Sequence, residues 1–254
     1  MKNILITGAG AGIGRATAEL FHSNGWSVGL TDVNETALAD LARALGRERV
    51  WWQALDVTDA SAVRAAVEAF AGQHDGYIQV LFNSAGLLRT GPFEKISPGA
   101  HRALVEVNVL GVMNMCHGAF NVLRKTPGAT VINMSSASAM YGTPDFASYS
   151  ASKFAVRGLT EALNIEWQKH DITVHDIMPP FVRTAMVESN PSPVVERMGV
   201  NLDPADVARA VWEEANSDTQ AVHRPVGWQF RMVMAMNRVM PSRVTREALR
   251  FLSR

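Results

Sequence analysis

The chain has 254 residues, enough for one large domain with a substantial buried core. Its 24 basic residues balance its 24 acidic residues, so we expect no nucleic-acid partner. The single cysteine, Cys116, excludes an internal disulfide framework and a multi-cysteine metal site, and we expect it to be buried on a helix. No signal peptide and no apolar run near the ~18 residues of a membrane span are apparent, which predicts a cytoplasmic protein.

Short apolar runs alternate with longer stretches of helical pattern. The runs predict strands, in chain order, at 3–7, 27–32, 50–55, 78–83, 129–135, 173–179 and, more weakly, 221–224. Most are apolar on successive residues, as in strands that are covered on both faces. Asn34, Ser97 and Asp203 are expected to cap helices between the strands, and Gly46 to end one. The alternation predicts a doubly wound (Rossmann-type) parallel α/β sheet of about seven strands, in a single domain over 1–254.

A glycine-rich turn, TGAGAGIG at residues 7–14, follows the first strand and opens a helix. The common dinucleotide pattern G-x-G-x-x-G does not fit this turn, whereas T-G-x-x-x-G-x-G fits with Gly8, Gly12 and Gly14. Glycines there permit a tight turn and a close approach of the backbone to a pyrophosphate at the helix N-terminus. Gly10 is an additional glycine to which the sequence assigns no role.

Asp32 ends the second predicted strand, eighteen residues beyond Gly14. A carboxylate at this point can accept hydrogen bonds from a ribose 2′-hydroxyl and repels a 2′-phosphate. No basic residue follows immediately, so the sequence favours NAD over NADP as the cofactor. The alternative is that Asp32 only caps the turn before the next helix.

Tyr149 and Lys153 are four residues apart, which in a helix places both side chains on one face. Ser136 lies thirteen residues upstream of the tyrosine. A nearby ammonium favours the phenolate, so Lys153 is expected to lower the pKa of Tyr149 from its usual ~10. The pattern Tyr-x-x-x-Lys also occurs by chance on exposed helices, and its interpretation depends on the other motifs.

With these motifs in order, the chain resembles the short-chain dehydrogenase/reductase family, in its compact single-domain branch, from residue 3 to about residue 184. The resemblance implies that the catalytic residues are Asn108, Ser136, Tyr149 and Lys153. The implied cofactor-binding residues are Gly8, Gly12, Ile13, Gly14, Asp32, Asp56, Val57, Asn83, Ala85, Gly86, Tyr149, Lys153, Pro179, Val182 and Thr184. The expected substrate-binding residues are Ser138, Met140, Phe146, Phe181 and Met186, with Tyr141 and Val187 as further pocket candidates.

The resemblance implies reversible hydride transfer between nicotinamide and a secondary alcohol or ketone. Tyr149 would exchange the proton, Lys153 would tune it and hold the nicotinamide ribose, and Ser136 would bind the substrate oxygen. Asn108 would hold a water that links Lys153 to solvent. No metal is implied, because the histidines show no ligand spacing, and the apolar pocket candidates favour a lipophilic substrate.

Two positions depart from the family pattern. Ser84 replaces the second asparagine of an Asn-Asn-Ala-Gly motif, and Pro180 replaces a glycine after the sixth strand. The proline fixes φ and removes a donor, so this loop is expected to be stiff.

Three other functions remain open. An NADP-dependent ketoreductase, such as an acyl-carrier-protein reductase, is disfavoured by Asp32. A non-catalytic dinucleotide-binding sensor would be expected to have lost Tyr149 or Lys153. An epimerase or dehydratase of the longer branch needs a larger C-terminal domain than this chain supplies.

The family resemblance also implies a homodimer that pairs helices near 98–123 and 149–170, while the missing C-terminal packing motif makes a tetramer doubtful. Residues 185–200 are expected to form a substrate loop, and 225–254 an apolar and basic extension. From Ala221 onward seven arginines face one acid, Glu247, a net charge of 7 − 1 = +6. The apolar residues of this tail are Trp228, Phe230, Met232, Met234, Met236, Met240, Val244, Leu249, Phe251 and Leu252. We favour their packing on the domain or over the pocket; the alternative is peripheral contact with an anionic membrane.

Overall fold

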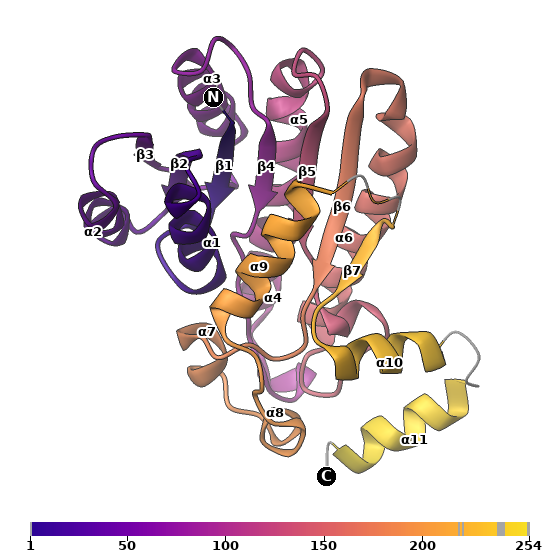
Figure 1. The fold of residues 1–254 in the computed structure, drawn as a ribbon. Helices are drawn as coiled ribbons and strands as arrows, with labels where there is room; N and C mark the ends of the chain where they lie inside the picture. The colour runs from indigo at the N-terminus through magenta and orange to yellow at the C-terminus, as the bar shows by residue number, and fades with distance from the viewer. Residues whose placement is uncertain (1, 218, 220, 238–241, 253–254) are drawn as a thin grey trace.

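The computed structural model describes residues 2–217, 219, 221–237 and 242–252. Seven parallel strands form one sheet in the order β3-β2-β1-β4-β5-β6-β7 (Figure 1). The strands are β1 (Asn3–Thr7), β2 (Ser27–Asp32), β3 (Val50–Ala54), β4 (Val80–Asn83), β5 (Ala129–Met134), β6 (Ile172–Met178) and β7 (His223–Pro225). The order reverses between β1 and β4, so the predicted doubly wound parallel sheet is confirmed.

The predicted strand boundaries are close to those in the structure. β1 and β2 begin and end at the predicted residues, whereas β4 begins two residues late, at Val80. The weak seventh strand exists but is shifted to His223–Pro225, where it pairs with the end of β6. Short edge strands carry little sequence pattern, because only a few residues take part in the sheet.

Helices cover both faces of the sheet (Figure 1). The α-helices are α1 (Gly12–Ser23), α2 (Glu35–Leu45), α3 (Ala60–Gly72), α4 (Pro98–Val105), α5 (Val112–Leu123), α6 (Ala147–Glu166), α7 (Ala185–Glu188), α8 (Pro193–Met198), α9 (Pro204–Ala215), α10 (Trp228–Asn237) and α11 (Ser242–Leu252). The 3-10 turns are η1 (Phe93–Lys95), η3 (Ala137–Ala139) and η4 (Gln168–His170), and η2 (Glu106–Gly111) is a π turn that joins α4 to α5.

The expected caps are present. Asn34 accepts from the backbone N–H of Ala37 at 3.0 Å, and Ser97 accepts from that of Ala100 at 3.2 Å. Asp203 and Asp206 form a capping box at the start of α9. These side chains satisfy N–H groups that the first turn of a helix leaves without partners.

Two hydrophobic cores lie on the two faces of the sheet. On one face α1 and α9 pack through residues such as Phe21 and Val211. On the other face α3, α5 and α6 pack through Val67, Cys116 and Val156. Cys116 is buried on α5 as expected, and burial raises the pKa of its thiol to about 12.

The helical stretch Pro98–Leu123 differs from one expectation. By length and composition it could cross a membrane, with a mean hydropathy of 1.3, although the sequence suggested no apolar run of that size. Its inner face packs on the sheet through residues such as Leu104, Met115 and Ala119. Core helices of globular proteins pass the same test, and the structure buries one face of this stretch against the sheet.

Candidate active site

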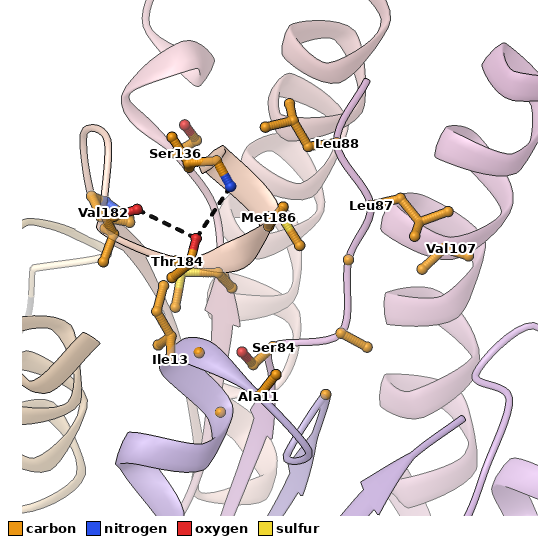
Figure 2. A pocket seen from close by; sticks show the side chains of 18 of the residues that line it. Ala11, Ile13, Ser84, Leu87, Leu88, Val107, Ser136, Val182, Thr184 and Met186 are labelled. Carbon is orange, nitrogen blue, oxygen red and sulfur yellow. Dashed lines mark hydrogen bonds between the residues drawn. The ribbon is translucent and has the colours of Figure 1, made fainter. Parts of the chain in front are cut away.

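A cavity of about 340 Å³ opens at the carboxyl ends of the central strands, and Figure 2 shows it from close by. Its walls come from the turn after β1 and from the segments that follow β2, β3, β4, β5 and β6, together with α6 and α7. Ligands of doubly wound sheets bind at this edge, beside the reversal in strand order. The topology therefore brings the predicted motifs to one place.

The turn after β1 packs against its neighbours without room for side chains. A Cβ at Gly14 would lie 2.1 Å from the carbonyl oxygen of Gly8, and one at Gly8 would lie 2.9 Å from the backbone nitrogen of Ala85. Gly8 and Gly12 also have φ angles of 67° and 52°, which favour glycine. The backbone and the start of α1 consequently face the cavity directly, an arrangement that fits a pyrophosphate.

Thr7 fixes the loop after β4 to this turn. Its hydroxyl accepts hydrogen bonds from the backbone N–H groups of Ser84 and Ala85, both at 3.0 Å. In the sequence, Thr7 is recognisable only as the first residue of the glycine motif. Its spacing to residue 84 carries no local signal, so the structure alone reveals this contact.

The structure assigns a role to Gly10. Its N–H donates to Asp32 Oδ2 at 3.0 Å, and a Cβ at Gly10 would come within 3.0 Å of the same oxygen. Asp32 Oδ1 accepts from the N–H of Asn34 at 2.9 Å. Asp32 therefore stabilises the turn before α2, and it also lines the cavity, where its remaining lone pairs can accept ribose hydroxyls.

Ser136, Tyr149 and Lys153 all line the cavity. The Ser136 hydroxyl accepts from the N–H of Ser138 at 3.1 Å and also forms a hydrogen bond with Tyr149. Lys153 Nζ donates to the carbonyl oxygen of Met134 at 2.7 Å and lies 5.5 Å from the centroid of the Tyr149 ring. The three side chains that the sequence selected thus converge.

Burial dominates the charge states of this group. It raises the pKa of Tyr149 to about 12, against the opposing effect of the Ser136 hydrogen bond. It lowers the pKa of Lys153 to about 8, against the opposing charge of Asp176. The expectation of a lowered tyrosine pKa is wrong for the protein alone, because desolvation of the phenolate dominates and the net shift of Tyr149 is upward.

Asn108 lies in the π turn η2 and is fully buried, outside the cavity lining. Its Oδ1 accepts from the N–H of Leu87 at 2.7 Å, and its Nδ2 donates to Leu87 O at 2.9 Å and to Ser152 Oγ at 3.1 Å. Asn108 therefore connects the segment after β4 to α6 through hydrogen bonds. Its water-holding role stays a prediction.

Most of the predicted cofactor-binding residues line the cavity. These are Gly8, Gly12, Ile13, Gly14, Asp32, Asp56, Val57, Ala85, Gly86, Tyr149, Lys153, Pro179, Val182 and Thr184. Thr184 also caps α7, because its hydroxyl accepts from the N–H of Val187 at 3.4 Å, and it donates to the oxygen of Val182 at 3.3 Å (Figure 2). Asn83 differs from the prediction, because its amide turns into the core and donates to Asn133 Oδ1 at 2.8 Å.

Some of the predicted substrate-binding residues line the cavity and others do not. Phe146, Phe181 and Met186 line the cavity, as does Val187. Ser138, Met140 and Tyr141 do not, because the η3 turn directs this segment toward the C-terminal part of the chain, where Met140 packs against a small cluster containing Phe230.

Several lining residues were not predicted. They are Ala11, Val33, Leu55, Ser84, Leu87, Leu88, Val107, Met134, Ser135, Pro180 and Ala185. Most directly adjoin a recognised motif, as Leu87 and Leu88 follow Gly86 in the segment drawn in Figure 2. Their position next to a motif was the sequence signal that could have identified them as lining residues. In the described part of the chain, no group of three or more His, Cys, Asp or Glu side chains is placed to hold a metal ion.

Comparison with known proteins agrees with this geometry. The family model described as short chain dehydrogenase matches residues 2–194. D-threitol dehydrogenase from Mycolicibacterium smegmatis is 34% identical over 187 residues, covering 73% of this chain and 72% of that protein.

Solved structures agree as well. The 3-ketoacyl-(acyl-carrier-protein) reductase from Brucella melitensis complexed with NADH superposes with a TM-score of 0.82 at 27% identity, covering 89% of this chain and 96% of that one. The alcohol dehydrogenase from the archaeon Thermococcus sibiricus complexed with 5-hydroxy-NADP gives a TM-score of 0.80 at 26% identity, over 89% and 96%.

The first prediction concerns the hydroxyl of Thr7. Thr7→Val leaves two N–H groups of the loop after β4 without an acceptor, at a cost of about 1–3 kcal/mol each, and should weaken NADH binding about tenfold. Thr31→Val is the matched control, because Thr31 pairs with Thr7 across the strands but donates only to Ile6 O. Fluorescence titration with NADH measures both, and an equal loss in the two variants would contradict the prediction.

Proposed function

Because the chain belongs to the short chain dehydrogenase family and is an oxidoreductase acting on CH–OH groups with NAD or NADP, we propose that it interconverts a lipophilic secondary alcohol and its ketone with NAD(H). One observation carries the proposal: Ser136, Tyr149 and Lys153 meet in a cavity bordered by the glycine turn. The dinucleotide would be held by the glycine-rich turn at residues 7–14, by Asp32 and by Thr184.

The chain's own residues would move the proton and orient the substrate. A bound nicotinamide accepts or supplies the hydride. Tyr149 Oη takes the proton of the substrate hydroxyl in the oxidising direction and returns it in the reverse direction. Ser136 donates to the substrate oxygen while charge develops there. Lys153 uses one N–H at Met134 O and keeps two donors for the ribose and for the electrostatic support of the phenolate.

The apolar walls support a lipophilic substrate. Leu88 and Phe146 form a small hydrophobic cluster with Val194 and Val195 of α8, and Tyr149 and Phe181 pack against it. Residues 185–200, the proposed substrate loop, thus cover the side of the cavity where Tyr149 lies. A 3-ketoacyl substrate is the alternative within the same reaction, favoured by the likeness to the Brucella melitensis reductase.

The second prediction tests the catalytic assignment. Tyr149→Phe removes the hydroxyl that exchanges the proton and should lower kcat more than about a hundredfold, with NADH binding nearly intact. Steroid, acyl-chain and terpenoid alcohols with NAD form the substrate screen. Phe146→Leu, a change in the same wall without a proton-transfer group, is the control. Substantial turnover by Tyr149→Phe would show that another group handles the proton.

We propose a preference for NAD over NADP, because Asp32 lines the cavity at the end of β2 and its carboxylate would repel a 2′-phosphate. The third prediction is that Asp32→Ala combined with Val33→Arg reverses the ratio of the two dissociation constants. Glu35→Ala, which removes a nearby acid outside the cavity lining, should leave the ratio unchanged. Tighter binding of NADPH than NADH by the unmodified protein would contradict the proposal.

A homodimer through the helices at 98–123 and α6 is the proposed assembly. Val105, Leu110 and Met113 are 40–47% exposed there, and Phe154 on α6 is 42% exposed. Apolar side chains gathered on helical faces are typical of subunit interfaces.

The fourth prediction follows from these exposed residues. Met113→Glu and Phe154→Glu should each convert a dimer to a monomer, because a charge would be buried without a partner. Val233→Glu, on α10, is the control. Light scattering at micromolar protein measures the mass, and a monomeric unmodified protein would rule the dimer out.

A cytoplasmic enzyme that contacts anionic membrane through its C-terminal helices is the remaining proposal. One face of α10 packs on the domain, where Phe230 and Met234 contact Met178 and the η3 turn. The other face is open to solvent, with Trp228 and Met232 70% and 55% exposed. Val233 and Met236 extend the exposed face. No described residue of the tail lines the cavity, so of the favoured interpretation the packing on the domain gains support and the roof over the pocket does not.

Arginines 243, 246 and 250 are exposed on α11, the helix that follows α10, and supply positive charge as an interfacial segment requires. Glu247 forms ion pairs with two of them, Arg246 and Arg250. Arg238, Met240 and Arg254, and the side chains of Leu249, Phe251 and Leu252, lie outside the described part of the chain.

The fifth prediction is that the protein sediments with anionic vesicles more than with neutral ones, and that Trp228→Ala with Met232→Ala abolishes the difference. Ile165→Ala, at a 73% exposed position on α6, is the matched control. Equal and negligible sedimentation with both vesicle types would exclude the membrane contact.

A further inference from the structure

Four ionisable side chains form a connected cluster at the β6–β7 edge of the sheet, on the face that α6 covers. Asp176 on β6 and His223 on β7 are cross-strand neighbours, and Asp176 Oδ2 lies 3.0 Å from His223 Nδ1. His223 Nε2 lies 2.9 Å from Glu161 Oε1, and Arg157 Nε donates to the same oxygen at 3.0 Å. The side chain of Asp176 is fully buried, while Glu161 reaches the surface.

The cluster reaches the loop that carries Ser136. Arg157 lies one helical turn after Lys153 on α6, and Glu161 lies one turn further, so the three share a face. Arg157 Nη1 donates to the carbonyl oxygen of Ala139 at 3.3 Å, in the 3-10 turn that Ser136 caps. Arg157 therefore connects the cluster to the turn that Ser136 caps, and it shares a face of α6 with Lys153.

The carboxylate of Asp176 lies in the same layer as the Lys153 ammonium. Asp176 pairs with Asn133 on β5, and Lys153 Nζ is bound to the carbonyl oxygen of the next residue, Met134. Asn133 donates to Thr160 of α6, which shows that this side of β5 faces the helix. The negative charge of Asp176 also opposes the effect of burial on the pKa of Lys153.

The two oxygens of the Asp176 carboxylate differ in their contacts. Among the described residues the buried Oδ1 has no hydrogen-bond partner, whereas Oδ2 contacts His223. A buried charge is costly unless another charge compensates it. Burial raises the pKa of Asp176, and His223 and Arg157 oppose that effect. Lys153 is a further cation on the side of the sheet that α6 covers.

We propose that Asp176, held in place by His223, is a positioning residue that keeps Lys153 in its ammonium form inside the buried site. The inference rests on the proposed role of Lys153 in the dinucleotide site. Without the carboxylate, burial alone would act on the lysine, and the ammonium would be lost closer to neutral pH.

The charges around Asp176 define how this arrangement responds to pH. Lys153, Arg157 and Glu161 approach from α6 and His223 from β7. Glu214 on α9 lies across the sheet, where it pairs with His175 at 3.1 Å and with Arg224 at 3.8 Å. Burial lowers the pKa of His223, but the hydrogen bond and charge of Asp176 and Glu161 outweigh it, so the net shift is upward. Protonated His223 then offsets part of the Asp176 charge.

The test is the pH dependence of NADH affinity, measured by fluorescence between about pH 6 and pH 10, which spans the titration of a buried lysine. Affinity should fall as Lys153 loses its proton. Asp176→Asn preserves shape but removes the charge, and should move this fall about one pH unit lower. Glu214→Gln removes a buried carboxylate from the opposite face and should leave it in place.

The outcomes separate this inference from the proposed function. If the unmodified protein fails to bind NADH, the proposed function fails and the inference with it. If it binds NADH but Asp176→Asn leaves the fall unmoved, only the inference is overturned. Equal shifts in Asp176→Asn and Glu214→Gln would indicate general disruption and would also overturn it. Asp176→Ser is the second charge-removing variant, and failure of both to fold by circular dichroism would make the role of Asp176 structural.

Discussion

The close approach of two backbone turns at the carboxyl edge of the sheet is the constraint on which the site depends. The turn after β1 and the loop after β4 meet with only 2.9 Å between a Cβ position at Gly8 and the nitrogen of Ala85. The Thr7 hydroxyl holds them together. Because the strand order reverses between β1 and β4, the helices that follow leave in different directions and the cavity forms above their junction. A side chain at Gly8 would separate the two turns, and one at Gly14 would clash with the backbone of the first turn itself.

Burial controls the chemistry at the other end of the cavity. Removing Tyr149 and Lys153 from water disfavours the charged form of each, so the phenol holds its proton and the lysine tends to lose one. A site that needs a phenolate and an ammonium therefore requires nearby charged groups that stabilise these two forms. The carboxylate of Asp176 supplies one such charge within the protein, and its burial is tolerated because His223, Arg157 and Glu161 connect it to the surface.

The C-terminal helices join this site to the molecular surface. One face of α10 packs through Phe230 and Met234 against Met178 and the η3 turn, immediately after Ser136. The opposite face presents Trp228 and Met232 to solvent. A ligand that binds the exposed face therefore contacts a helix that packs against the turn capped by Ser136. The helices α10 and α11 lie at the same end of the molecule as α8 (Figure 1).

Features that depend on local pattern could be predicted from the amino-acid sequence. Continuous apolar runs bounded by turn residues located β1 and β2 to the residue, and Asn34, Ser97 and Asp203 marked helix starts because capping involves neighbours in the chain. The i, i+4 spacing placed Tyr149 and Lys153 on one helical face. Asp32 was located by its place at the end of a strand.

Contacts between distant segments and the effects of burial could be seen only in the folded chain. The bond of Gly10 to Asp32, the inward turn of Asn83 and the pairing of Asp176 with His223 join residues 22 to 50 positions apart, for which the sequence carries no periodic signal. The upward shift of the Tyr149 pKa had the same origin. A neighbouring lysine is visible in the sequence, but the desolvation that outweighs it exists only after the chain has packed around both groups.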